Sequence, residues 1–168
     1  MEYRKEKVDD YPGIDAVNQL AFDGEAEMKV VRQLRDTKKL LLSMVACSAG
    51  EVWGHITYSR AWIQTEEAQI ASVALGPMAV HPKYQKTGIG TELIQISLWE
   101  LKNMGEAHVF VLGHTWFYPR FGFLPASQFH ITSVYKEAGD HFMGLELQNR
   151  ALDGLSGKFL YDPAFEGV

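Results

Sequence analysis

The stretch His81-Pro82-Lys83-Tyr84-Gln85-Lys86-Thr87-Gly88-Ile89-Gly90 joins two segments of different character. Before it, residues 70–80 are mostly apolar and have the length of a buried strand. After it, residues 88–104 carry apolar side chains at helical spacing and stop at Gly105, and residues 107–112 form a second apolar run. The succession of strand, turn, helix and strand predicts a mixed α/β domain.

The helix start at Gly88 is suited to bind an anion. The first N–H groups of a helix have no internal acceptor and carry partial positive charge. Gly88 and Gly90 place no side chain between a phosphate and the backbone. The pattern lacks the Gly-Lys-Ser/Thr ending of a P-loop and, with Leu93 at that position, the third glycine of a dinucleotide fingerprint. Taken alone, it also fits an ordinary helix start. Side chains that can assist an anion are Lys86, Thr87 and Thr91.

Two helices are predicted near the N-terminus, after a short strand over residues 2–8. The first is capped at Asp9 or Asp10 and runs to Phe22, and the second follows Asp23-Gly24. Basic residues at the end of the second helix, where they favourably meet its negative end, are Arg32, Arg35, Lys38 and Lys39.

A hairpin is predicted next, from an apolar run over residues 40–46 and a turn at residues 48–50. Alternation in residues 52–58 places Val52, Ile56 and Tyr58 on one face. His55 can then face either the cleft or a solvated face of the sheet, and the solvated face is the preferred interpretation. Farther along, Pro77 indicates a bulge or an edge in the strand over residues 70–80. Two more strand-like runs cover residues 129–134 and 142–147.

Composition indicates a soluble globular protein. The 168 residues are 46% hydrophobic and 22% charged, with a net charge of −5, which disfavours a nucleic-acid-binding protein. No apolar run reaches the roughly 18 residues of a membrane span, and no signal peptide is evident. The single Cys47 excludes an intrachain disulfide, and we expect it to be an inert core residue. We expect a cytoplasmic protein without a membrane partner.

Three motifs occur together: Gly76-Pro77-Met78-Ala79-Val80-His81-Pro82, the glycine-rich turn, and Phe117-Tyr118-Pro119-Arg120-Phe121-Gly122-Phe123. In this order and spacing they resemble the GCN5-related N-acetyltransferase (GNAT) family, most closely its bacterial YhbS-like branch. Weaker similarity extends the resemblance over nearly the whole chain. We therefore expect a single N-acetyltransferase domain over residues 1–168, with a core of about 1–148 and a C-terminal extension over 149–168.

The resemblance implies antiparallel strands that pass into two splayed parallel strands, with acetyl-CoA inserted between them. The splay is implied at Gly76-Pro77. Backbone groups of Met78, Ala79 and Val80 would pair with the pantetheine arm, and N–H groups from Gln85 to Gly90 would hold the pyrophosphate. An N–H near Ala79 or Val80 would polarise the thioester carbonyl. Relatives often have Asn after the second parallel strand, where this chain has Gly113-His114, so a contact from that Asn is not implied here.

Tyr118 matches the family tyrosine that lies four residues before the glycine of a Gly-Phe pair, and the resemblance implies that it protonates the leaving thiolate. The alternative is that Tyr118 only packs in an aromatic cluster. Weaker candidates for a base or substrate contact are Glu27 and His114, and Glu27 is also explained by its place in the first turn of a helix. No histidine spacing indicates a metal site.

Two functions fit the sequence. The first is an N-acetyltransferase that moves an acetyl group from acetyl-CoA to a primary amine of a small molecule or peptide by direct attack. The second is a catalytically silent domain that binds acyl-CoA as a sensor or binds a partner. The acceptor and the acyl chain length are not defined by the sequence, and a homodimer stays open.

Overall fold

The computed structural model describes residues 1–168, and contacts within the chain group them into two compact units. Unit 1 consists of Met1–Ser59, Gly76–Trp99 and Pro163–Val168, and unit 2 of Arg60–Leu75 and Glu100–Asp162. Each unit has its own hydrophobic clusters. The single domain with a C-terminal extension stays a prediction.

Antiparallel strands form the sheet of unit 1. They are β1 (Glu2–Lys5), β2 (Leu40–Ser48) and the first part of β3 (Glu51–Gln64), paired in that order. β1 is shorter than the predicted strand over residues 2–8, because the short 3-10 helix η1 (Val8–Asp10) follows it. The Asp10 carboxylate fixes this turn by accepting from the Lys7 N–H at 2.7 Å and from the Arg4 guanidinium at 2.6 and 3.0 Å.

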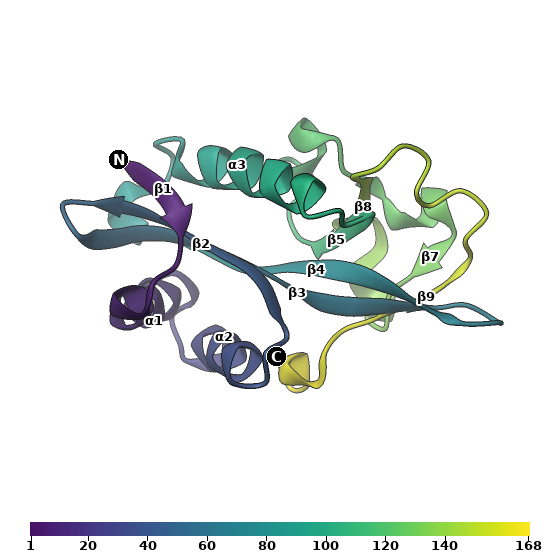
Figure 1. Cartoon of the computed structure of the whole chain (residues 1–168), viewed down its shortest axis with the longest axis horizontal. Coiled ribbons are helices and arrows are strands. Elements are labelled where there is room, and N and C mark those ends of the chain that lie inside the picture. The colour runs from purple at the N-terminus through teal and green to yellow at the C-terminus, as the bar shows by residue number, and fades with distance from the viewer. The chain divides into compact units, whose positions relative to one another are not determined.

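Helices cover both faces of this sheet. They are α1 (Tyr11–Phe22), α2 (Ala26–Asp36) and α3 (Ile89–Asn103), close to the predicted ranges. Figure 1 shows α1 and α2 on one face of the strands of unit 1 and α3 on the other. α3 packs tightly against β3 because Gly54 has no side chain: a Cβ there would lie 2.8 Å from Ile89 Cγ2 and 3.0 Å from Leu93 Cδ1.

A β-bulge interrupts the pairing of β2 with β3. Ala46 pairs with Gly54, but Cys47 pairs with Val52, so Trp53 is an extra residue in β3. An extra residue reverses the alternation of side chains on either side of it. The prediction that Val52 shares a face with Ile56 and Tyr58 is therefore wrong, because Val52 lies on the other side of the bulge.

Side chains on the two sides of the bulge show this reversal. Val52 packs with Ile14 and Val17 of α1. Tyr58, beyond the bulge, instead faces α3, where its hydroxyl lies 2.7 Å from Ser97 Oγ. The prediction failed because the bulge is set by pairing with β2, which the pattern of one strand does not contain.

Unit 2 contains the second part of β3, the first part of β4 (residues 69–75) and all of the later strands. Their bounds are β4 (Gln69–Val80), β5 (His108–Leu112), β6 (Leu124–Pro125), β7 (Ile131–Thr132), β8 (Phe142–Glu146) and β9 (Gly157–Leu160). β4 and β5 are parallel, with Ala74 opposite Phe110 and Leu75 opposite Val111. β5 pairs antiparallel with β8 and β8 with β6, while β9 pairs with the end of β3 and with β7. The predicted strand over residues 129–134 is reduced to β7.

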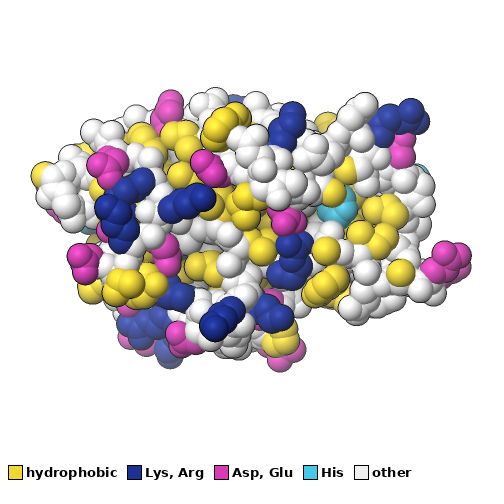
Figure 2. All heavy atoms as spheres, in the orientation of Figure 1, with side chains coloured by type: hydrophobic (Ala, Val, Ile, Leu, Met, Phe, Trp, Pro, Cys, Tyr) yellow, Lys and Arg dark blue, Asp and Glu magenta, His cyan; other side chains and the backbone are white.

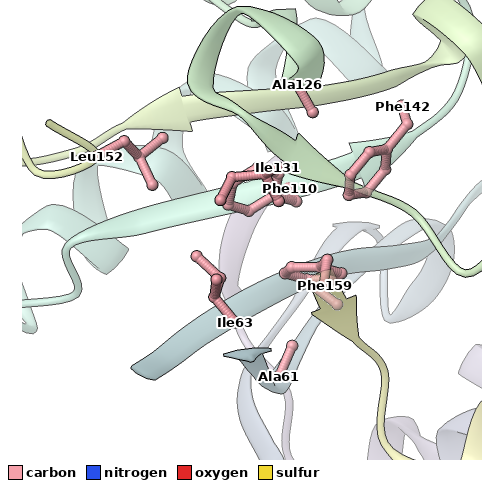
Figure 3. Packing of buried hydrophobic residues seen from close by; sticks show 9 residues of the cluster. Ala61, Ile63, Phe110, Ala126, Ile131, Phe142, Leu152 and Phe159 are labelled. Atoms are coloured by element: carbon pink, nitrogen blue, oxygen red, sulfur yellow. The ribbon is translucent and has the colours of Figure 1, made fainter. Parts of the chain in front are cut away.

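Aromatic rings dominate the core of unit 2 (Figure 3). The ring of Phe110 lies 4.8 Å from that of Phe159 and 5.5 Å from that of Phe142, measured between centroids. Gly144 on β8 makes room for it, since a Cβ there would lie 2.7 Å from Phe110 Cε1. Ile63 and Leu152 complete the apolar surroundings.

Short 3-10 helices make up much of the connecting chain. They are η2 (Pro82–Tyr84), η3 (Tyr118–Phe121), η4 (Ala126–Phe129), η5 (Lys136–His141) and η6 (Pro163–Phe165). Pro77 does not end β4, and the peptide bond between Gly76 and Pro77 is cis. None of the helices is long and apolar enough to cross a membrane.

Charges of both signs are interspersed on the surface, as the viewed face in Figure 2 shows. At the end of α2, basic side chains pair with carboxylates. Arg32 contacts Asp15 at 2.6 Å, and Arg35 donates two hydrogen bonds of 2.9 Å to Glu6. For Arg32 and Arg35, these carboxylates are more direct partners than the predicted helix dipole.

Candidate active site

The glycine-rich turn lies in unit 1 between β4 and α3, as predicted. His81 follows β4, and its N–H donates to the carbonyl of Trp53 at 2.8 Å. Gln85 to Gly88 are exposed. Lys86 and Gly88 have positive φ angles of 63° and 94°, so the chain reverses direction sharply before α3 begins.

Free donors gather at the start of α3. The first hydrogen bond of the helix joins Glu92 N–H to the carbonyl of Gly88 at 3.1 Å. No acceptor in the protein satisfies the backbone N–H groups of the four residues before Glu92, which are Gly88, Ile89, Gly90 and Thr91. A Cβ at Gly88 would meet no atom within 4 Å, so open space adjoins these donors. The arrangement is that of an anion site at a helix N-terminus.

The residues predicted to face the pantetheine arm form the end of β4 in unit 1. Ala79 is buried against α1, while Met78 and Val80 are half-buried. The carbonyl of Val80 accepts a hydrogen bond from Gln85 Nε2 at 3.1 Å, which ties the turn to the strand. The end of β4 and the glycine-rich turn are therefore connected by a side-chain hydrogen bond as well as by the chain itself.

Tyr118 begins η3 in unit 2, and its ring is buried. The ring packs edge-on against Phe117 and Phe123, with centroid distances of 5.1 and 5.7 Å. Its hydroxyl forms no hydrogen bond within the protein, and it is not among the fully buried polar atoms without a partner. Burial raises the pKa of Tyr118 to about 12. The phenol therefore keeps its proton at neutral pH and can donate it to a ligand.

Gly113, which the sequence presented only as a departure from the family pattern, supports Tyr118. A Cβ at Gly113 would overlap the ring of Tyr118. The glycine thus allows the ring to lie directly against the backbone after β5. No sequence signal indicated this contact, because it depends on how η3 folds back.

The weaker candidates occupy separate units. Glu27 is half-buried in the first turn of α2 in unit 1 and forms no ion pair. His114 is exposed in unit 2, and its ring stacks on Trp116 at 5.1 Å. The carbonyl of His114 accepts a hydrogen bond from the Tyr118 N–H at 3.3 Å, so His114 adjoins the tyrosine in the same loop. No group of three or more His, Cys, Asp or Glu side chains is placed to hold a metal ion.

The prediction that His55 lies on a solvated face is wrong. His55 is fully buried between α1 and β2. Asn18 Nδ2 lies 3.1 Å from His55 Nδ1, and His55 Nε2 lies 2.8 Å from Ser43 Oγ. The Ser43 hydroxyl donates in turn to Glu6. In this series of hydrogen bonds, His55 Nδ1 accepts from Asn18 and His55 Nε2–H donates to Ser43. An imidazole that accepts at one nitrogen and donates at the other is neutral.

Lowering the pH should reduce the free energy of unfolding, because His55 is buried in its neutral form. Burial lowers the pKa of His55 to about 4 in the folded protein, whereas an unfolded histidine titrates near 6.5. Between these pH values the unfolded chain binds more protons than the folded protein. The contribution of His55 to the free energy of unfolding is therefore complete above about pH 6.5 and is lost as the pH falls toward 4. The loss by pH 4.5 should be about 2–3 kcal/mol in the free energy of unfolding.

Urea denaturation of the wild type and of His55→Gln at pH 7 and pH 4.5 measures this effect. The variant should lose less stability between the two pH values, because it has no imidazole to titrate. Asp10, whose pKa is lowered by its hydrogen bond from Arg4, titrates in both proteins and cancels in the comparison. Equal losses would show that His55 does not contribute.

The fold and the turn together define a mixed α/β protein with free N–H groups at the start of α3, as expected for an acetyltransferase. Residues 41–125 match the family described as "Acetyltransferase (GNAT) domain". The "Uncharacterized N-acetyltransferase YhbS" of Escherichia coli K12 is 34% identical over 157 residues, covering 93% of each chain. The chain therefore belongs to the GNAT acetyltransferase family. The predicted family, fold class and enzyme class, an acyltransferase, are confirmed.

Two solved structures are similar over nearly the whole chain. A YhbS structure from Escherichia coli in complex with CoA has a TM-score of 0.90 and 31% identity, covering 98% of this chain and 91% of the other. A GNAT family acetyltransferase from Brucella melitensis in complex with acetyl-CoA has a TM-score of 0.81 and 32% identity, covering 98% and 97%.

Proposed function

We propose that the protein transfers an acetyl group from acetyl-CoA to a primary amine of a small molecule or peptide. The observation that carries this proposal is the open start of α3, where four consecutive N–H groups have no acceptor in the protein. The complexes of similar proteins with CoA and acetyl-CoA support it. Cytoplasmic location and a homodimer stay predictions.

The coenzyme would be held mainly by backbone groups. The pyrophosphate would accept hydrogen bonds from the turn and the first turn of α3, while the pantetheine arm would pair with the end of β4. Lys86 would add a positive charge and Thr87 and Thr91 hydroxyl groups. The residues assigned to the coenzyme are Met78, Ala79, Val80, Gln85, Lys86, Thr87, Gly88, Ile89, Gly90 and Thr91.

The reaction would be a direct attack. The lone pair of a neutral amine forms the C–N bond at the thioester carbonyl carbon, and the carbonyl electron pair moves onto oxygen. A backbone N–H near Ala79 or Val80 would stabilise that oxyanion. The electron pair then returns, the C–S bond breaks, and the sulfur leaves with its electrons. Tyr118 donates a hydrogen bond to the sulfur and gives it the proton, and the proton released by nitrogen restores the phenol.

The general base is the least defined part of this mechanism. Glu27 and His114 are the candidates among side chains, and a chain of water molecules can replace either. The net charge of −5 favours a cationic acceptor over an anionic one.

A catalytically silent acyl-CoA sensor is the second candidate function, and the unassigned base is what favours it. Release of free CoA thiol from acetyl-CoA, measured with a panel of primary amines and short peptides, separates the two. Amine-dependent release supports the enzyme. Tight acetyl-CoA binding without release for any amine supports the sensor.

Cys47 should take no covalent part in turnover. It is buried in unit 1, and burial raises the pKa of its thiol, so little thiolate is available as a nucleophile. Turnover of Cys47→Ala, corrected for the folded fraction, should equal that of the wild type, although some stability is lost with the Arg4 contact to Sγ at 3.6 Å. Mass spectrometry showing an acetylated Cys47 during turnover would contradict direct attack.

A further inference from the structure

The indole of Trp53 lies flat on the ring of Tyr84, which ends η2 within the glycine-rich turn. The ring centroids are 3.6 Å apart and the planes differ by 7°. Trp53 is the extra residue of the bulge in β3, and bulges commonly re-aim a side chain next to a functional site. The bulge therefore places an aromatic surface under η2 that regular alternation would not provide.

Hydrogen bonds connect this stacked pair to the donors of the turn. The carbonyl of Trp53 accepts from His81 N–H, and the carbonyl of His81 accepts from Tyr84 N–H, both at 2.8 Å. The carbonyl of Tyr84 accepts from the Thr87 hydroxyl at 2.5 Å. Thr87 immediately precedes Gly88, which is the first of the four consecutive residues before Glu92 whose N–H groups are free. An unbroken series of contacts thus runs from Trp53 through Tyr84 to the anion site.

The ring of Trp53, rather than its N–H group, carries the contact. Its Nε1 is buried and has no hydrogen-bond partner. A residue kept for hydrogen bonding would use this donor, so stacking is the interaction that the structure uses. Phenylalanine at this position would retain an aromatic surface for Tyr84 and lose only an unused donor.

We propose that Trp53 is a positioning residue for the coenzyme: it holds Tyr84, and through Tyr84 the exposed turn, in the conformation that presents the N–H groups to the pyrophosphate. The proposal rests on the proposed function, since it assumes that the turn binds CoA. A turn that is already in its binding conformation loses less conformational freedom on binding, and affinity rises accordingly.

Calorimetric titration with CoA tests the proposal. Trp53→Ala and Tyr84→Ala should each weaken CoA binding about tenfold, and Trp53→Phe should restore most of the affinity. Trp99→Ala is the matched control: it removes an indole that is 64% exposed on α3, so CoA affinity should not change. Each variant is first checked by thermal unfolding. If Trp53→Ala does not fold, Tyr84→Ala and Trp53→Phe still test the contact.

The double variant Trp53→Ala/Tyr84→Ala distinguishes positioning from general damage. If Trp53 acts through Tyr84, the double variant binds CoA about as weakly as either single variant. Two independent losses that multiply would overturn the proposal, as would unchanged affinity in folded Trp53→Ala or folded Tyr84→Ala. Failure of the wild type to bind CoA would instead overturn the proposed coenzyme site.

Discussion

Tyr118→Phe should lower turnover by roughly 10²–10⁴-fold, with acetyl-CoA affinity almost unchanged, because general acid catalysis typically contributes that much. Phenylalanine keeps the ring that packs on Gly113, Phe117 and Phe123 and removes only the hydroxyl. Steady-state kinetics with any working amine, combined with calorimetry for acetyl-CoA, measures both quantities. The loss should appear in kcat, since the hydroxyl acts on the leaving sulfur.

Tyr135→Phe is a matched control for this experiment. It removes a phenol from another aromatic pair of unit 2, where Tyr135 and Tyr161 lie 5.7 Å apart, and it should not change turnover. Turnover of Tyr118→Phe within threefold of the wild type would return Tyr118 to a packing role and leave protonation of the thiolate to water.

The pH profile gives a second readout for Tyr118. Burial raises its pKa to about 12, and the protonated form is the active one, so activity that depends on it persists up to that pH. Between pH 8 and pH 10, kcat of the wild type should therefore not decline through loss of the Tyr118 proton. The pH profiles of the wild type and of Tyr118→Phe should then have the same shape in this range. A decline near pH 10 that is specific to the wild type would show that the phenol titrates as an exposed tyrosine does.

Elements defined by local sequence were predicted well. α1, α2 and α3 have strong apolar periodicity and clear ends, and the turn at Gly88 follows from residues that are adjacent in the chain. The very short strands were predicted poorly: β7 has two residues and β9 has four. Their hydrogen bonds go to strands far away in the sequence, so their own residues carry little signal.

The site differs from the predictions where a residue contacts another element of the fold. His55 looks like a polar residue on an exposed face until Asn18 of α1 and Ser43 of β2 cover it. Gly113 looks like a missing asparagine until Tyr118 folds onto it. Trp53 looks like one more residue in an alternating strand, because its bulge is visible only in the register with β2. In all three cases the role is decided by a contact with another strand, helix or turn, which the residue's own sequence pattern does not contain.

The glycine-rich turn should respond most strongly to negative charge. Gly88→Asp together with Gly90→Glu places bulk and two carboxylates at the free N–H groups that are proposed to face the pyrophosphate. Affinity for acetyl-CoA should fall at least tenfold, equivalent to about 1.4 kcal/mol or more. Calorimetry on the folded double variant measures the loss, and thermal unfolding verifies that the fold is retained.

Backbone strain is the alternative cause of such a loss, and Gly105→Asp controls for it. Gly88 has a φ of 94° and Gly105 one of 86°, so an aspartate is strained at either position. Gly105 follows the other end of α3, away from the free N–H groups. Gly105→Asp should therefore lower stability but keep the affinity for acetyl-CoA. Equal affinity losses in the two variants would mean that strain transmitted through α3 explains the effect. Unchanged affinity in the double variant would mean that the turn is only a helix start.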